Sequence, residues 1–176
     1  MQNKLADTYI PAEDTFFLAD HIKEERGQAA LEIGTGSGYL AKILEKNFEL
    51  VIATDIDYFA LQGQDDGIKN RICCTGADAL GAKFDLIVCN LPYLPTEKIV
   101  DRTTDGGPEG LEIPLQIIQS ASTRLKPNGK MLYLTSSLAN YEKLVEKIGS
   151  LGFEAKILAK KKLFFEELII VHARRK

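Results

Sequence analysis

Cysteine is scarce in this sequence, and the few cysteines do not have the spacing of a metal site. Three occur among 176 residues: Cys73 and Cys74 are adjacent, and Cys89 stands alone. So small a number argues against a disulfide-stabilised secreted protein and favours a reducing compartment. Without a C-x₂-C pair there is no metal centre to predict. We expect the three thiols to be small buried hydrophobic residues within strands.

Long apolar runs and a strong excess of positive charge are also missing. No run approaches the roughly 18 apolar residues that a membrane span requires. Residues 1–7 lack the apolar segment of a secretory signal. We therefore expect a cytoplasmic protein without a membrane partner. The formal net charge of −3 argues against direct nucleic-acid binding through bulk positive charge.

The length and composition fit one globular domain. The chain has 176 residues, of which 45% are hydrophobic and 27% charged, and a domain typically has roughly 150 residues. We find no internal repeat, low-complexity tract or Pro/Ser-rich linker. The whole chain, residues 1–176, is therefore predicted to be a single domain, with residues 1–25 forming an N-terminal segment and helix.

Short apolar segments alternate with amphipathic helical segments. Strands are expected at residues 29–33, 50–54, 71–74, 84–89 and 130–135, and helices at 13–22, 38–46, 58–64, 115–124 and 139–151. Consecutive apolar residues are typical of parallel strands covered on both faces. Two further strands, 153–157 and 167–171, flank a loop at 160–166 and leave no room for a crossover helix. The pattern predicts an α/β fold whose seven-stranded, mostly parallel sheet ends in an antiparallel hairpin.

Residues 94–112 are the longest segment without clear periodicity. They include Gly106, Gly107, Pro108 and Gly110, and long irregular loops in compact domains are usually functional. We therefore predict a substrate-side loop here.

A glycine-rich loop follows the first predicted strand. Gly34, Gly36 and Gly38 have the spacing G-x-G-x-G, which differs from the G-x-G-x-x-G of dinucleotide-binding proteins. Glycines allow a ligand to approach the backbone closely, and the N–H groups at the following helix start favour an anion. A plain strand–helix turn would explain one or two of these glycines, so the loop is a moderate signal of a ligand site.

Acidic residues stand at the ends of the first three strands. Glu32 is the last residue but one of the first strand, Asp55 closes the second, and Asp78 follows the third. Asp55 is placed to accept hydrogen bonds from ribose hydroxyls, Asp78 from an adenine amino group, and Asp57 to cap the next helix. Any single loop aspartate is more often a turn residue, but the series favours a nucleoside site at the carboxyl edge of the sheet.

The fourth strand ends in Asn90-Leu91-Pro92-Tyr93. Pro92 drives Leu91 toward an extended conformation. The Leu91 carbonyl can then point in the same direction as the Asn90 side-chain oxygen. Two neighbouring acceptors suit an –NH₂ group, and the Tyr93 ring offers a flat face for a planar amide or base.

This segment resembles the N-P-P-Y motif of class I S-adenosylmethionine-dependent methyltransferases, with Leu91 in place of the first proline. The stretch Glu32-Ile33-Gly34-Thr35-Gly36-Ser37-Gly38 resembles their first motif. Two other stretches, Tyr9-Ile10-Pro11-Ala12-Glu13-Asp14-Thr15 and Asp105-Gly106-Gly107-Pro108-Glu109-Gly110, are similar to the HemK-related protein glutamine methyltransferases of the short archaeal and eukaryotic type. The resemblance spans essentially the whole chain.

The resemblance implies a Rossmann-like fold, S-adenosyl-L-methionine as the cofactor, and a class I peptide-chain release factor as the substrate. Such enzymes methylate the glutamine amide of a Gly-Gly-Gln motif. A small zinc-binding activator subunit is a possible partner, and the apolar edge strand at 71–74 is where it would dock. The implied catalytic residues are Asn90, Leu91, Pro92 and Tyr93; the implied cofactor-binding residues are Thr15, Glu32, Gly34, Thr35, Gly36, Gly38, Asp55, Ile56, Asp78, Ala79 and Asn90.

Other roles stay open from the residues alone. Thr15, in Glu13-Asp14-Thr15, also fits a helix N-terminus. The methyl acceptor could instead be a nucleic-acid adenine N6 or a protein lysine; the small size and the net charge argue against the adenine. A nicotinamide-dependent reductase or a non-catalytic scaffold could share a Rossmann-like sheet. The glycine spacing and the Asn-Leu-Pro-Tyr segment argue against both.

Overall fold

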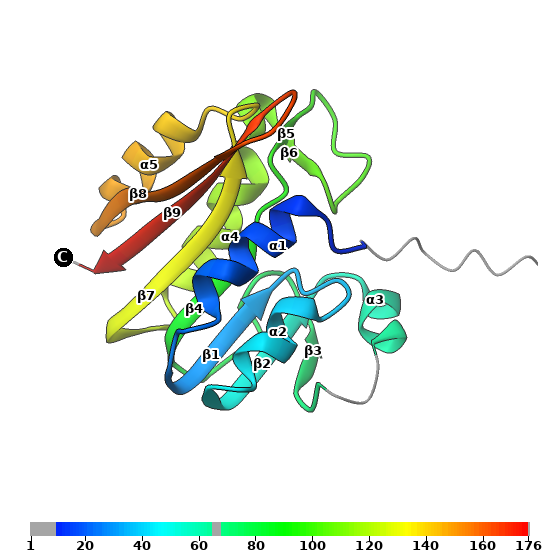
Figure 1. Cartoon of the computed structure of the whole chain (residues 1–176), viewed down its shortest axis with the longest axis vertical. Coiled ribbons are helices and arrows are strands. Elements are labelled where there is room, and N and C mark those ends of the chain that lie inside the picture. Colours follow the sequence, from blue (N-terminus) through cyan, green and yellow to red (C-terminus); the bar gives the residue numbers. More distant parts are fainter. Residues whose placement is uncertain (1–9, 65–67, 176) are drawn as a thin grey trace, which may run out of the picture.

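The computed structural model describes residues 10–64 and 68–175 and has a seven-stranded sheet at its centre (Figure 1). Tyr9 of the N-terminal motif lies outside the described residues. Across the sheet the order is β3-β2-β1-β4-β7-β9-β8. The strands are β1 (Gly27–Ile33), β2 (Phe48–Asp55), β3 (Arg71–Cys73), β4 (Phe84–Asn90), β7 (Leu125–Ser136), β8 (Phe153–Lys162) and β9 (Glu167–Arg175).

Strand direction divides the sheet into two parts. The pairs β1–β2, β2–β3, β1–β4 and β4–β7 are parallel, whereas β9 is antiparallel to both β7 and β8. The predicted mostly parallel sheet with an antiparallel C-terminal hairpin is confirmed. The register pairs Ile33 with Cys89 and Asn90 with Leu134. The ends of β1 and β4 therefore lie at one edge of the sheet.

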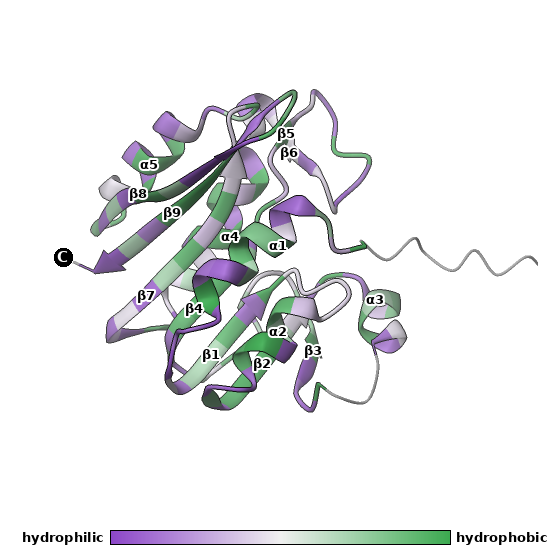
Figure 2. Ribbon diagram, viewed as in Figure 1, coloured by the Kyte–Doolittle hydropathy of each residue, from purple (hydrophilic) through white to green (hydrophobic). Residues whose placement is uncertain are grey.

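Helices cover both faces of the sheet. One apolar cluster joins it to α1 (Glu13–Ile22) and α2 (Tyr39–Leu44), and the other to α4 (Glu112–Ser122) and α5 (Tyr141–Ser150). The shorter α3 (Tyr58–Gly63) lies beside β3 (Figure 1). Figure 2 shows the central strand β4 as largely hydrophobic, as expected for a strand buried on both faces.

Three segments differ from the sequence-based expectation. The segment at 94–112 is only partly irregular: residues 96–104 form a loop without helix or strand, but β5 (Leu94–Pro95) pairs in parallel with β6 (Asp105–Gly107), and a 3₁₀ turn, η1 (Pro108–Gly110), follows. Strand β7 begins before residue 130, because Leu125 already pairs with Phe84 across a register shift. The predicted loop at 160–166 is shorter than expected, since β8 continues to Lys162.

The expectation of three buried cysteines is only partly correct. Cys89 is fully buried in β4, whereas Cys73 is exposed and Cys74 is half-buried. The physical reason is the position of β3, a three-residue strand at the edge of the sheet. Within residues 10–64 and 68–175, no helix has the length and apolar character needed to cross a membrane.

Candidate active site

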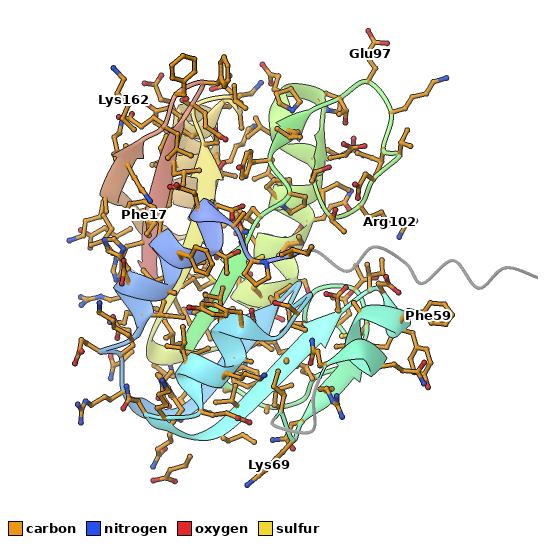
Figure 3. All side chains as sticks on the ribbon, turned by 45° about the vertical axis from the view of Figure 1, so that its right-hand side comes forward. Phe17, Phe59, Lys69, Glu97, Arg102 and Lys162 are labelled. Carbon is orange, nitrogen blue, oxygen red and sulfur yellow. The ribbon has the colours of Figure 1, made fainter. Side chains whose placement is uncertain are left out.

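A small hollow at the carboxyl ends of β1 and β4 brings together several residues that the sequence motifs predicted for the site. Thr15 comes from the first turn of α1, and Asn90 ends β4. Figure 3 shows α1, which carries the labelled Phe17, crossing close to the end of β4. The hollow is lined by Thr15, Glu32, Gly34, Thr35, Ser37, Tyr39, Leu40 and Asn90. The glycine loop and the Asn-Leu-Pro-Tyr segment thus share one site.

The three glycines of the loop all adopt positive φ angles. The values are 69° at Gly34, 50° at Gly36 and 78° at Gly38, a region that side-chain-bearing residues seldom adopt. A Cβ atom at Gly38 would lie 2.0 Å from Cδ1 of Ile68, whereas one at Gly34 would have no neighbour within 4 Å. Gly38 is therefore needed for packing, while Gly34 leaves the loop open to a ligand.

Glu32 ties this loop to the start of α2. Its Oε2 accepts hydrogen bonds from Thr35 Oγ1 at 2.6 Å and from the Ala41 N–H at 2.8 Å. Burial raises the pKa of the Glu32 carboxyl to about 8, and the two hydrogen bonds act in the opposite direction. Glu32 lines the hollow but uses one oxygen to stabilise the fold, so it holds the loop in shape as well as facing the site.

Asp55 contacts the same loop from the end of β2. Oδ2 accepts the Gly36 N–H at 2.8 Å, and Oδ1 accepts the Asp57 N–H at 2.9 Å. A carboxylate offers about four acceptor positions, so capacity for ribose hydroxyls remains. Asp57 caps α3 by accepting the Phe59 N–H at 2.8 Å, which confirms the capping prediction.

Asp78 is held by a residue that sequence reasoning missed. Ser120 of α4 donates from Oγ to Asp78 Oδ1 at 2.5 Å and accepts the Ala77 N–H at 2.9 Å. No local motif marks Ser120, because its partner lies 42 positions away.

Some of the predicted cofactor-binding residues do not line the hollow. These are Gly36, Gly38, Asp55, Ile56, Asp78 and Ala79, and their cofactor-binding roles stay predictions. Asp78, Ala79 and Ile56 are exposed.

Asn90 has its two amide atoms in different environments. Nδ2 donates to Oδ2 of Asp14 at 3.0 Å. Oδ1 is buried and has no hydrogen-bond partner among the described residues. The other carboxylate oxygen of Asp14 accepts the N–H of Thr15 at 2.6 Å. In the sequence, Asp14 indicates only the start of a helix. Its position next to Thr15 is the one feature that could have suggested a role for Asp14 in the site.

The residues after Asn90 pack on opposite faces of the sheet. The Leu91 N–H donates to the Leu134 carbonyl at 3.1 Å, and the leucine side chain is buried in the cluster that contacts α4 and α5. Tyr93 packs against the cluster on the α1 side. Leu91 therefore fills apolar space where the related motif has proline, and Pro92 between them is also buried.

Two glycines of the segment at 94–112 pack closely against the backbone of the Asn90-Leu91-Pro92-Tyr93 segment. A Cβ atom at Gly106 would lie 2.6 Å from the Pro92 carbonyl oxygen, and one at Gly110 would lie 2.2 Å from that of Tyr93. Gly110 also has a φ of 68°. Only glycine allows this close approach, so the glycine-rich stretch fixes the backbone that follows Asn90.

The hollow lacks an obvious general base among the described residues. Neither histidine lines it. Burial raises the pKa of the nearby Cys89 thiol and of the Tyr133 hydroxyl, which are both fully enclosed. Glu32 has a pKa of about 8, but its carboxyl is engaged by the loop. The site is thus built to position groups by hydrogen bonds.

A metal centre is not among the features of this site. Across residues 10–64 and 68–175, no group of three or more His, Cys, Asp or Glu side chains could hold a metal ion.

A sheet of this strand order, with a glycine loop after β1 and Asn-Leu-Pro-Tyr after β4, defines a class I methyltransferase. The sequence model of the family described as "Methyltransferase small domain" matches residues 13–164. The chain belongs to this family, and within it to the HemK-related methyltransferases. Membership in this family argues against the reductase and scaffold alternatives.

Individual relatives agree with this assignment. A protein of Methanocaldococcus jannaschii, whose name assigns it to the protein N5-glutamine methyltransferases, is 32% identical over 95% of this chain and 91% of its own length. The methyltransferase HEMK2 of Mus musculus is 28% identical over 84% of this chain and 80% of its own. A chain of the solved Mtq2–Trm112 complex of E. cuniculi has a TM-score of 0.83 at 23% identity, over 96% and 98% of the two chains.

The cofactor of this class is S-adenosylmethionine, and solved methyltransferases of similar fold contain it or its product. The residues present fit this group. Gly34 opens the loop backbone to a ligand, and the Asp55 carboxylate accepts only two hydrogen bonds within the fold, which leaves capacity for ribose hydroxyls. When bound, S-adenosylmethionine supplies an electrophilic methyl carbon. Thr15, the glycine loop and Asp55 are the residues that would hold it.

Proposed function

We propose that this protein methylates the side-chain amide nitrogen of the glutamine in the Gly-Gly-Gln motif of a class I peptide-chain release factor. The names of several relatives support this: protein N5-glutamine methyltransferase in M. jannaschii and release factor glutamine methyltransferase in Moorella thermoacetica. The E. cuniculi Mtq2–Trm112 complex is described as responsible for methylating the translation termination factor eRF1.

The observation that carries the proposal is the unpartnered Oδ1 of Asn90. Leaving a buried acceptor without a donor costs about 1–3 kcal/mol, so the site is arranged for a ligand that brings an N–H. The opposite end of the same amide is held by Asp14 at 3.0 Å. A primary amide carries two hydrogens. Asn90 Oδ1 would accept one, and the Leu91 main-chain carbonyl would accept the other.

This pair of acceptors suits the chemistry of an amide nucleophile. The amide lone pair is delocalised, so the nitrogen reacts only when it is aligned with the electrophilic carbon, and alignment can supply roughly 7–11 kcal/mol in the best cases. The two oxygens also stabilise the positive charge that grows on the nitrogen during methyl transfer. Tyr93 would keep the amide plane in place. The nitrogen–carbon bond would form as the sulfur–carbon bond breaks, S-adenosylhomocysteine would leave, and the methylated nitrogen would release one proton to solvent. No general base in the hollow is required in this scheme, in agreement with its composition.

Mass spectrometry of a release factor tests the proposal directly. The factor is incubated with enzyme and S-adenosylmethionine, and we expect one added methyl group on the Gly-Gly-Gln glutamine. A factor with that glutamine replaced by asparagine is the matched control and should gain none. Duplex DNA and a lysine-rich protein are offered in parallel. Methyl groups on either of these, with none on the release factor, would contradict the proposal.

We also propose that a small zinc-binding activator subunit pairs with the edge of β3. Only β2 flanks this strand in the sheet of the described residues, and unpaired edges accept a strand from another chain. Beside it, the aromatic residues Tyr58 and Phe59 are 56% and 65% exposed. The E. cuniculi Mtq2 was solved as a complex with Trm112, which supports a partner of this kind.

Co-expression followed by light scattering checks this partner. We expect a 1:1 complex with such an activator and none for a Cys73→Pro variant. Asn70 and Cys74 bond to β2 through their backbones, so the Cys73 N–H faces the open edge, and proline removes this donor. Leu151→Ser is the control, since Leu151 is an exposed residue in the turn after α5, away from β3. Loss of the complex in both variants, or in neither, would contradict a partner at this edge.

We propose a cytoplasmic location on the same grounds. The three cysteines of the described residues are free thiols, as expected of a protein in a reducing compartment. Fractionation of cells that express the tagged protein would check this location.

A further inference from the structure

The turn between β8 and β9, residues 163–166, carries two exposed aromatic side chains. Phe164 is 91% and Phe165 87% exposed, and their ring centroids lie 4.6 Å apart with the planes at 78°. The centres of tight turns usually hold Gly, Pro, Asn, Asp or Ser, each for a conformational reason. Two phenylalanines satisfy none of these reasons. We call residues 163–166 the aromatic turn.

The aromatic turn is fixed by contacts that do not involve either ring. The Leu163 N–H donates to the Glu166 carbonyl at 2.8 Å, which closes the turn, and Ser136 Oγ donates to the Glu166 carboxylate. The Ser137 N–H donates to the Glu167 carbonyl at 2.8 Å. The rings are therefore presented on an ordered support, and a preorganised surface loses less entropy when it binds a partner.

The aromatic turn stands at the same edge of the sheet as Asn90. Asn90 pairs with Leu134, and Leu134 pairs with Ile170 of β9. Strands lie roughly 4.8 Å apart and rise about 3.3 Å per residue. The two phenylalanines, five and six residues before Ile170, therefore stand about 10 Å to the side of Asn90 and roughly 17–20 Å beyond it. Figure 1 shows the turn at the end of the molecule where β5 and β6 lie, and Figure 3 places Lys162 and Glu97 at this end.

We infer that the aromatic turn, Phe164 with Phe165, is a docking surface for the body of the protein substrate beside its glutamine-bearing loop. This inference rests on the proposed function. When the glutamine side chain of a substrate protein reaches Asn90, the rest of that protein lies against this edge of the sheet. Two phenylalanines offer roughly 300–500 Å² of apolar surface, which calls for an apolar patch on the substrate. Such contacts would raise the affinity for an intact substrate protein without taking part in methyl transfer.

Other occupants fit the position less well. The proposed activator would pair with β3, which lies at the opposite end of the strand order from β8. The aromatic turn and the β3 edge are thus separated by the whole width of the sheet. Continuity with the opening over Asn90 favours the substrate. A second copy of this chain is the remaining occupant, and light scattering distinguishes it.

The test compares steady-state methylation of an intact release factor by the wild type and by a Phe164→Ser/Phe165→Ser double variant. We expect KM for the factor to rise about 10-fold, which corresponds to about 1.4 kcal/mol, while kcat at saturating factor and the cofactor affinity stay unchanged. Leu158→Ser is the matched control, because Leu158 lies on β8 before the turn and is 45% exposed. This control should leave KM unchanged.

The outcomes separate this inference from the proposed function. A wild-type enzyme that does not methylate the factor overturns both. An active wild type together with an unchanged KM in the double variant overturns the inference alone. So does a wild-type dimer that dissociates in the double variant, seen by light scattering. If the double variant loses cofactor binding, and is therefore misfolded, the single Phe164→Ser and Phe165→Ser variants are measured in its place and are held to the same expected rise in KM.

Discussion

Asn90 and Asp14 are joined by a hydrogen bond of 3.0 Å between Nδ2 and Oδ2, across 76 positions of the chain. A carboxylate accepts hydrogen bonds and donates none. Asp14 therefore requires the nitrogen end of the Asn90 amide to face it. The oxygen end must then face away from Asp14, and Oδ1 is the buried atom that has no partner among the described residues. Helix α1 thus sets the orientation of a side chain on β4.

Replacing Asp14 should impair catalysis without removing the cofactor. Asp14→Ala frees the Asn90 amide to rotate, and the loss of a hydrogen bond to a charged group predicts a fall in kcat of about 10–100-fold. Asp14→Asn should recover part of the rate, since its side-chain oxygen can still accept from Nδ2. Glu13→Ala is the control, because the Glu13 carboxylate forms a surface ion pair with Lys161 at 2.7 Å. Weakened cofactor binding alongside the lost turnover in Asp14→Ala would instead indicate a damaged fold.

Asn90→Ala should be more severe. It removes the acceptor itself, so we expect turnover to drop by about 10²–10³, as for other lost transition-state hydrogen bonds. Calorimetry should show nearly unchanged affinity for S-adenosylmethionine. An equal loss of cofactor affinity would identify Asn90 as a structural residue.

Asp55→Ala should have the opposite profile. Asp55 accepts the Gly36 N–H and is placed for ribose hydroxyls, so its loss should weaken cofactor binding by about 10–100-fold. Asp57→Ala is the neighbouring control: it loses the α3 cap and about 1 kcal/mol of stability, with the cofactor affinity retained. Titration calorimetry on both variants decides. Unchanged affinity in Asp55→Ala would remove this residue from the site.

Gly110→Ala should disturb the catalytic turn through its backbone. The new Cβ would meet the Tyr93 carbonyl oxygen at 2.2 Å in a residue with φ of 68°. We expect a loss of about 1–3 kcal/mol in the free energy of unfolding and a lower kcat. Gly149→Ala, within α5 and with no atom within 4 Å of the new methyl, should instead stabilise by about 0.4–1 kcal/mol. Denaturant unfolding measures the stability of both variants. Equal stabilities would show that the close packing of Gly110 on the Tyr93 carbonyl is unimportant.

Stability should decline as pH rises because of Glu32. Its pKa is about 8 in the folded protein, against 4.5 ordinarily. Between these values the folded chain holds a proton that the unfolded chain releases, so the free energy of unfolding falls with increasing pH, and the loss is complete above about pH 8. Glu32→Gln keeps an acceptor for Thr35 and Ala41 but does not titrate. Urea midpoints at pH 5 and pH 9 should therefore differ less in Glu32→Gln than in the wild type; parallel shifts would contradict the assignment.

Local sequence determined the elements and the motifs of this protein. Apolar runs set the parallel strands, Asp57 marked a helix start, and the glycine spacing marked a loop whose conformation side chains would prevent. The chemistry of Asn90 followed from its neighbours in the chain. These features depend on residues a few positions apart, and short-range sterics and hydrogen bonding decide them.

The tertiary structure alone decided which distant groups meet. Three contacts cannot be read from the hydrophobic pattern of the sequence: Asp14 with Asn90, Ser120 with Asp78, and Gly110 with the Tyr93 carbonyl. Each contact depends on how helices and loops pack on the sheet. The residue that each side chain meets is therefore decided by tertiary packing. The same holds for the pKa of Glu32, because burial is a property of the packed protein and not of the local sequence.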